Sequence, residues 1–164
     1  MVRRIVSYGE RAAIADTIRF KFDELEGQTP AAGVYTGKIV IPAYSIILDI
    51  VVAQMALWNA GTSANLIVGD DDDDNGFYSG IDMKATDLLA GESLSFSYDG
   101  TSADSGAYLD DTSTHVLGRI SSVERTITAT LTTVGTVPTT GETFVTVVHS
   151  PSIGNTRKAV FTAT

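Results

Sequence analysis

The chain has 164 residues, which fits one domain, and its 43% hydrophobic and 19% charged residues are typical of a globular protein. It contains no cysteine, which excludes disulfides, thiolate metal sites and a cysteine nucleophile. Its formal net charge of −9 argues against binding to the phosphate backbone of nucleic acids, so we expect no nucleic-acid partner.

The chain begins with a polar stretch that lacks the apolar run of a signal peptide. We assign residues 1–16 to an N-terminal arm and residues 17–164 to a β-sandwich domain. Residues 10–16 (ERAAIAD) have the composition for about two helical turns. We expect the arm to bind an acidic partner, and an ordinary solvated terminus is the alternative. The arm contains three arginines: Arg3, Arg4 and Arg11.

Most local patterns after the arm indicate strands. Apolar and polar residues alternate with period 2, or β-branched residues follow one another, as is typical of strands. Glycine and proline interrupt these segments at regular intervals, which indicates an all-β sandwich or barrel of short antiparallel strands. The clearest segments are 18–22 (IRFKF), 34–41 (VYTGKIVI), 94–98 (LSFSY), 125–132 (RTITATLT) and 143–148 (TFVTVV).

The most apolar run covers residues 46–58 (IILDIVVAQMALW). It is shorter than the ~20 residues that a membrane helix needs, so we expect no membrane partner. The run is too uniformly apolar for a strand with one solvated face. It is either a strand covered on both faces or a buried helix, and the β-branched pairs after Pro42 favour the strand. We expect Trp58 to cap the core, and residues 86–90 to form one helical turn before Gly91.

Acidic residues are concentrated in the middle of the chain. Residues 39–118 contain thirteen acids and one base, whereas the segments on either side carry small positive charges. Five consecutive aspartates, Asp70 to Asp74, precede Asn75-Gly76. With Gly76 at position 6 of an EF-hand-type loop, the ligand positions predict a calcium site. Its ligands would be Asp71, Asp73, Asn75, Ser79 and Asp82.

A solvated hairpin loop is the alternative for this stretch. In that interpretation it joins a strand at 66–68 to one near 81–84, and Asn75-Gly76 makes the turn. The flanks favour strands rather than the two helices of an EF-hand. We therefore predict no cofactor, with calcium as a hypothesis.

The sequence contains no motif typical of an enzyme, and we predict no catalytic residues. His115 lies near serine and aspartate residues, but no nucleophile elbow accompanies them. We expect His149 to face solvent or a subunit interface. We expect three tyrosines to anchor loops, with an interface role as the alternative: Tyr78, Tyr98 and Tyr108.

The order of several motifs resembles a known family. A segment KIVIPA (38–43) precedes the apolar strand at 47–52. A strand ending in VGD (66–70) then precedes an acidic loop with Phe77-Tyr78, and TGETFVTVV (140–148) follows near the C-terminus. This order resembles the β-sandwich decoration or head-spike-base proteins of tailed bacteriophages and gene-transfer particles.

The resemblance implies an all-β, single antiparallel sandwich of jelly-roll type that performs no catalysis. Such a protein is a homotrimer or other homo-oligomer. It binds the major capsid protein on the outer surface of the virion, in some cases below a head fibre or spike, after synthesis in the host cytoplasm. We therefore expect a capsid decoration or cementing protein. The alternatives are a carbohydrate- or receptor-binding module of a fibre, assisted by calcium, and a tail structural subunit.

Overall fold

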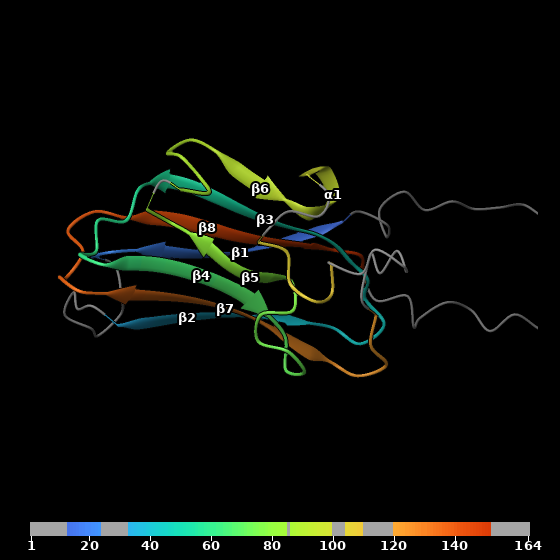
Figure 1. Cartoon of the computed structure of the whole chain (residues 1–164). Coiled ribbons are helices and arrows are strands. Elements are labelled where there is room, and N and C mark those ends of the chain that lie inside the picture. The colour runs from blue at the N-terminus through green and yellow to red at the C-terminus, as the bar shows by residue number, and fades with distance from the viewer. Residues whose placement is uncertain (1–12, 24–32, 85, 100–103, 110–119, 152–164) are drawn as a thin grey trace, which may run out of the picture.

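The computed structural model describes residues 13–23, 33–84, 86–99, 104–109 and 120–151 of the chain. In this part the chain forms eight strands and one short helix (Figure 1). They are β1 (Ile14–Lys21), β2 (Val34–Ile41), β3 (Ile47–Ala56), β4 (Ser63–Gly69), β5 (Tyr78–Asp82), β6 (Ser93–Ser95), α1 (Phe96–Asp99), β7 (Arg125–Val134) and β8 (Glu142–His149).

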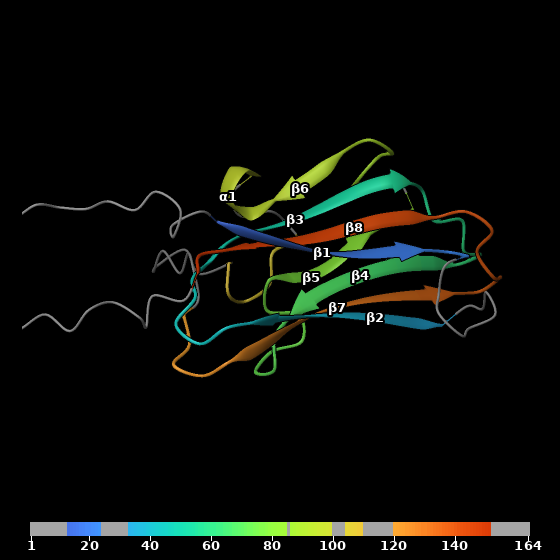
Figure 2. The ribbon, with the colours of Figure 1, turned by 180° about the vertical axis from the view of Figure 1, so that it is seen from behind.

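The strands form two four-stranded sheets, and every pairing within them is antiparallel. The first sheet has the order β1-β8-β3-β6, and the second sheet has the order β2-β7-β4-β5 (Figures 1 and 2). The prediction of an all-β, antiparallel fold is therefore confirmed. Strands from distant parts of the chain lie side by side, because β1 pairs with β8 and β2 with β7.

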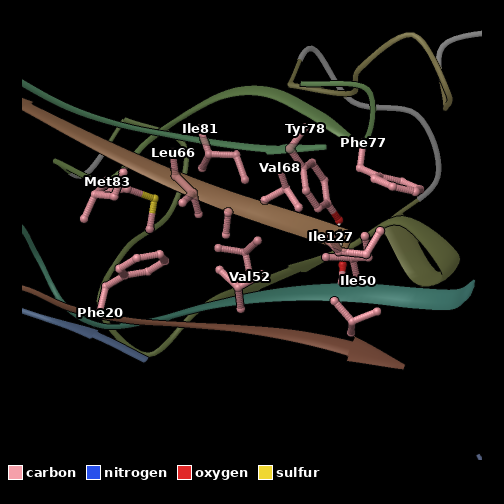
Figure 3. Close-up of a cluster of buried hydrophobic side chains, with 14 of the residues drawn as sticks. Phe20, Ile50, Val52, Leu66, Val68, Phe77, Tyr78, Ile81, Met83 and Ile127 are labelled. Atoms are coloured by element: carbon pink, nitrogen blue, oxygen red, sulfur yellow. Dashed lines mark hydrogen bonds between the residues drawn. The ribbon is translucent and has the colours of Figure 1, made fainter. Parts of the chain in front are cut away.

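The core lies between the inner faces of the two sheets. Along β7, Ile127, Ala129 and Leu131 are buried, while the threonines between them are only partly buried. This alternation is the period of a strand whose one face is covered. Figure 3 shows Tyr78 of the second sheet pointing toward Ile50 of the first, where its hydroxyl donates to the Ile50 carbonyl at 2.8 Å. This bond joins the two sheets across the core.

The apolar run at 46–58 forms β3, as its β-branched pairs predicted. Trp58, which follows β3, is buried and caps the core as expected. The expectation that β3 is covered on both faces is wrong for the described part of the chain, because Leu48 and Met55 are exposed.

Two local predictions are wrong at the edge of the first sheet. The predicted strand at 94–98 ends at Ser95, and Phe96–Asp99 forms α1 instead. The carboxylate of Asp49 accepts hydrogen bonds from the hydroxyls of Ser95 and Ser97 at 2.5 and 2.6 Å, and this contact accompanies the change of direction. The predicted helical turn at 86–90 is not a helix but a series of bends and turns.

The start of the first sheet differs from the predicted arm boundary. β1 begins at Ile14, and Ile14, Ala15 and Asp16 pair with β8, so these three residues form neither arm nor helix. A strand partner is available to them because β8 extends to His149. Of the rest of the predicted arm, Ala13 has no regular structure and residues 1–12 lie outside the described residues.

A buried chain of hydrogen bonds links Trp58 to the first sheet. The indole Nε1 of Trp58 donates to the hydroxyl of Thr143 at 2.9 Å, and that hydroxyl donates to Oε1 of Gln54 at 2.9 Å. All three residues are buried. The amide of Gln54 also donates to the Met83 carbonyl at 3.1 Å, so the polar groups of this chain are satisfied within the core.

We predict that Thr143→Val lowers the free energy of unfolding by about 2 kcal/mol or more, because the isosteric change leaves buried polar groups of Trp58 and Gln54 without this partner. Chemical denaturation measures the loss. The matched control is Thr146→Val on the same strand, whose hydroxyl meets that of Thr17 at an exposed site. Equal losses in the two variants would show that the buried hydrogen bonds of Thr143 stabilise the protein no more than the exposed hydrogen bond of Thr146.

Candidate functional site

The run of five aspartates forms the loop between β4 and β5, and its members differ in environment. Asp70 is buried, with only 6% of its surface exposed, whereas Asp71, Asp72 and Asp74 are exposed. Identical residues in one run therefore have different roles. The buried member shapes the loop, and the exposed members supply the surface charge.

Asp70 closes the loop through its carboxylate. Its Oδ1 accepts hydrogen bonds from the backbone N–H groups of Asp72 and Asp73 at 3.1 and 3.3 Å. The same oxygen accepts a hydrogen bond from the Tyr108 hydroxyl at 2.7 Å. The carboxylate thus satisfies backbone donors that the tight loop would otherwise leave without partners.

A second contact ties Asp70 to the start of β7. Its Oδ2 lies 4.0 Å from Nη1 of Arg125, and both side chains are almost fully buried. Arg125 is the first residue of β7, and β7 pairs with β4 immediately before the loop. The ion pair therefore joins the loop to the strand beside it, in surroundings where removing either charge is costly.

The loop also packs against residues 104–109. The backbone N–H of Tyr108 donates to the Gly76 carbonyl at 2.8 Å, and that of Gly106 donates to the Phe77 carbonyl at 2.9 Å. The ring of Tyr108 lies so close to Gly76 that a Cβ there would be 2.2 Å from it. Glycine is required at position 76 for this close approach.

The predicted hairpin between β4 and β5 is present, but its turn differs from the prediction. The N–H of Gly76 donates to the Asp73 carbonyl at 3.3 Å, so Asp74 and Asn75 are the central residues of the turn. Neither Asn75 nor Gly76 has a positive φ, which a type I′ turn at that pair would require. The turn therefore lies one residue earlier than predicted, and Gly76 follows it, where its carbonyl accepts a hydrogen bond from the Tyr108 N–H.

The five predicted calcium ligands are distributed along the loop and along β5. Asp71 accepts a hydrogen bond from the Thr126 N–H at 3.1 Å, on the side of β7. Asp73 accepts one from the Asn75 N–H at 3.3 Å, within the turn. Two of the predicted ligands thus hold backbone groups rather than turning toward one point.

Asn75 is partly buried in the turn itself, and the remaining two ligands lie in β5. The hydroxyl of Ser79 donates to the carbonyls of Asp104 and Ser105 at 3.3 Å. Asp82 pairs with Asn65 of β4 at the far end of β5 and accepts a hydrogen bond from the Lys84 N–H at 2.8 Å. An EF-hand loop needs its twelfth residue to return toward the first, and an extended strand prevents that return.

The structure therefore does not gather the predicted ligand set. Within the described ranges, no three His, Cys, Asp or Glu side chains are grouped to hold one metal ion.

A pocket of about 230 Å³ lies beside the loop. The buried pair Asp70 and Arg125 forms part of its wall, and exposed carboxylates and apolar side chains form the rest. Its lining residues are Asp70, Asp71, Asp72, Ile120, Ser121, Val123, Glu124 and Arg125.

A second group of carboxylates lies near the end of β5. Partial burial, with a smaller contribution from the charge of Asp87, raises the pKa of Asp104 above its usual value. Asp87 itself accepts a hydrogen bond from the Asp82 N–H at 2.6 Å. Asp82, Asp87 and Asp104 thus add negative charge beside β5.

The expectation that His149 faces solvent or a subunit interface is wrong. Its side chain is 2% exposed, and Nε2 lies 3.1 Å from Oδ2 of Asp16. Nδ1 lies 2.9 Å from the Ser150 carbonyl. His149 follows Val145 and Val147 on the inward face of β8, which accounts for its burial. His115 and the three arginines of the predicted arm, Arg3, Arg4 and Arg11, lie outside the described residues.

Most aromatic side chains in the described ranges are buried or partly buried, and Tyr44 is 44% exposed. Trp58 and Tyr78 are buried, and Tyr108 is partly buried against Phe77 with ring centroids 5.1 Å apart. Tyr108 therefore anchors the acidic loop, as expected, through its hydrogen bond to Asp70. Tyr78 instead lies in β5 and joins the two sheets across the core. The side chain of Tyr98 lies outside the described residues. No helix in the described segments is long and apolar enough to cross a membrane.

We predict that Asp70→Asn lowers the free energy of unfolding by about 2 kcal/mol or more, because it weakens charge-assisted hydrogen bonds and the buried pair with Arg125. Asp74→Asn makes the same chemical change at an exposed position of the same run. We expect the control to change stability by less than about 0.5 kcal/mol. Urea denaturation of both variants distinguishes a loop held by Asp70 from a generic acidic turn.

Calcium is predicted to leave the stability of the protein unchanged, because the five candidate ligands are not brought together. A site filled at 100 times its dissociation constant would add about 2.7 kcal/mol to the free energy of unfolding. Differential scanning calorimetry in 2 mM calcium and in EDTA measures this. A rise in melting temperature that Asp73→Asn abolishes would contradict the prediction and restore the metal site.

No family model matches the chain, and no curated protein sequence matches it. Among solved structures, it is similar to a chain in "Acidic stable capsid structure of Helicobacter pylori bacteriophage KHP30". The TM-score is 0.54 at 12% sequence identity, and the match covers 85% of this chain and 88% of that chain. At this identity the two chains share a fold, and the match extends over nearly all of both.

Proposed function

We propose that this chain is a structural protein of a bacteriophage virion, and specifically a decoration or cementing protein. In this role it forms an oligomer and binds the major capsid protein on the outside of the head. The observation that carries the proposal is the shared fold with a chain of a bacteriophage capsid structure, over 85% of this chain and 88% of the other.

The strand order supports a jelly-roll assignment within this proposal. Strands pair from the ends of the chain inward, β1 with β8, β2 with β7, β3 with β6 and β4 with β5, always antiparallel. This is the arrangement of one long hairpin rolled into two sheets. Jelly rolls occur in viral capsid domains but also in lectins. The capsid context of the similar chain favours the first.

The described surface supports binding to a capsid more than binding to a sugar. Sugar-binding sites commonly present several exposed aromatic rings, whereas here Trp58 and Tyr78 are buried and Tyr44, at 44%, is the aromatic residue with substantial exposure among those described. The exposed aspartates of the loop, Asp71, Asp72 and Asp74, suit a solvent-facing surface. A cementing role requires no catalysis and no cofactor.

The proposed mechanism is mechanical. A bound copy contacts neighbouring capsid subunits at once, so loss of one subunit must also break the contact with the decoration protein. At a free concentration of 100 times the dissociation constant, binding stabilises each site by about 2.7 kcal/mol. An oligomer that engages several sites gains further through effective concentration. The arginines of residues 1–12 are the proposed contact with the capsid.

The test uses heads assembled from the major capsid protein of the same phage without this chain. We expect the purified chain to co-sediment saturably with these heads in EDTA and to raise their melting temperature. Replacing Arg3, Arg4 and Arg11 together by glutamate is expected to weaken binding at least tenfold. The control variant replaces Asp72 and Asp74 of the solvent-facing loop by asparagine and is expected to bind normally.

Two outcomes would overturn the proposal, and a third would reject only the arginine contact. A chain that binds no heads but forms stacked rings or tubes by electron microscopy is a tail subunit. Calcium-dependent binding to a glycan array without binding to heads indicates a receptor-binding module. Normal head binding by the triple glutamate variant would reject the arginine contact while leaving the decoration role intact.

A further inference from the structure

Exposed apolar side chains gather around the pocket beside the acidic loop. Ile120 and Val123, which line the pocket, are 51% and 66% exposed. Tyr44 lies next to this wall and is 44% exposed, and its backbone N–H donates to the Ser121 carbonyl at 2.7 Å. The pocket therefore offers apolar surface as well as charge to an occupant.

The backbone of Tyr44 is strained at this place. Its φ is +61°, in the left-handed region that bulky residues rarely adopt, and such a conformation costs of order 1–3 kcal/mol. Residues held in this way are concentrated at binding sites and ligand clamps. The strain holds an exposed aromatic residue beside the pocket, which supports a binding role for this end of the sandwich.

The charge of the pocket selects a basic occupant. Asp70 and Arg125 compensate each other within the wall, whereas Asp71, Asp72 and Glu124 add three exposed carboxylates. A concave surface of one sign concentrates ions of the opposite sign. Arginine and lysine suit a surface that is both acidic and apolar, because their aliphatic stems cover apolar groups while their charged heads reach carboxylates.

The C-terminal segment of this chain has the required chemistry. Residues 152–164 (SIGNTRKAVFTAT) contain two adjacent bases, Arg157 and Lys158, and no acid. Apolar residues follow at Val160 and Phe161. The segment therefore combines positive charge with apolar side chains, as the pocket does with negative charge.

The segment also begins close to the pocket. The end of β8 lies at the same end of the sandwich as the end of β4 and the start of β7 (Figures 1 and 2). The N–H of Ser150 donates to the Ile46 carbonyl at 2.8 Å, and Ile46 forms a β-bridge with Ile120 in the pocket wall. Two such steps cover about 10 Å, whereas the chain from Ser150 to Arg157 can extend over roughly 20 Å. Arg157 can therefore reach the pocket of its own chain.

The N-terminal arm is a less suitable occupant. Residues 1–12 include Glu10 among their charged residues, and they precede β1. In the first sheet β8 lies between β1 and β3, so Ile14 is one strand further than His149 from the Ile46 side.

We propose that the pocket beside the acidic loop is the docking site for residues 152–164 of the same chain. Arg157 and Lys158 then face the exposed carboxylates, and the apolar residues that follow cover Ile120 and Val123. A short tether gives an effective concentration of order millimolar, so a contact that is weak between separate molecules is sufficient. This inference does not depend on the proposed virion role.

Paramagnetic relaxation measured by NMR on the full chain tests the proposal. The chain has no cysteine, so Thr164→Cys provides a single site for a nitroxide label. A docked segment is expected to broaden the amide signals of Asp72 and Val123 several-fold more than that of Ala15. An undocked segment would broaden Ala15 at least as strongly, because Ala15 pairs with Val148 beside the end of β8.

Charge reversals identify the contact within the labelled chain. Replacing Arg157 and Lys158 by glutamate is expected to remove the preference for Asp72 and Val123. The control is Lys38→Glu, at an exposed position of β2, which is expected to retain the preference. Replacing Asp72 and Glu124 by lysine is also expected to remove it, and combining the two pairs of reversals is expected to restore it.

Four results would overturn the proposal. The first is equal broadening of Val123 and Ala15 in the labelled chain, and the second is a preference that survives reversal of Arg157 and Lys158. A preference that is lost only when the arginines of residues 1–12 are replaced by glutamate would assign the pocket to the arm. Broadening of an unlabelled copy mixed with a labelled one would assign the pocket to a second molecule.

Discussion

Strands β7 and β8 lie at the centre of the two sheets, and the alternation of their side chains constrains every other strand. Each pairs with two neighbours in a fixed register, β7 with β2 and β4, and β8 with β1 and β3. A slip of one residue in β7 would turn Ile127 and Leu131 to the outside and bring threonines into the core. Since both neighbours follow the same register, the error would extend across the whole sheet.

The same local alternation made these strands predictable from the sequence. In the segments at 34–41, 125–132 and 143–148, buried and outward side chains alternate along the sequence. These segments form strands close to the expected bounds. The end of β6 was not predictable, because the Asp49 carboxylate that contacts Ser95 and Ser97 lies more than forty residues earlier in the chain. Local pattern indicates where a strand begins and continues, whereas distant contacts decide where it stops.

The acidic loop shows the same limit for site residues. Five identical aspartates satisfy any pattern of alternating ligands, so the sequence could not distinguish Asp70 from its neighbours. Its burial depends on Tyr108 and Arg125, which are 38 and 55 residues later in the chain. His149 was misjudged for a similar reason, since its partner Asp16 lies on a strand 133 residues away. The spacing of His149 from Val145 and Val147 could have predicted its burial, because residues two apart on a strand share one face and all three lie on the inward face of β8.

Paired carboxylates connect the acidic loop to the rest of the fold. The exposed aspartates Asp71, Asp72 and Asp74 belong to the connection between β4 and β5 of the second sheet. Asp70, in the same run, is buried and lies beside Arg125 at the start of β7, where the loss of either charge would leave the other unpaired in the core. Glu142 at the start of β8 is paired with Arg19 of β1 in the same way, but at a more exposed position where the pair contributes less. The same chemical group therefore holds the loop in place where it is buried and supplies surface charge where it is exposed.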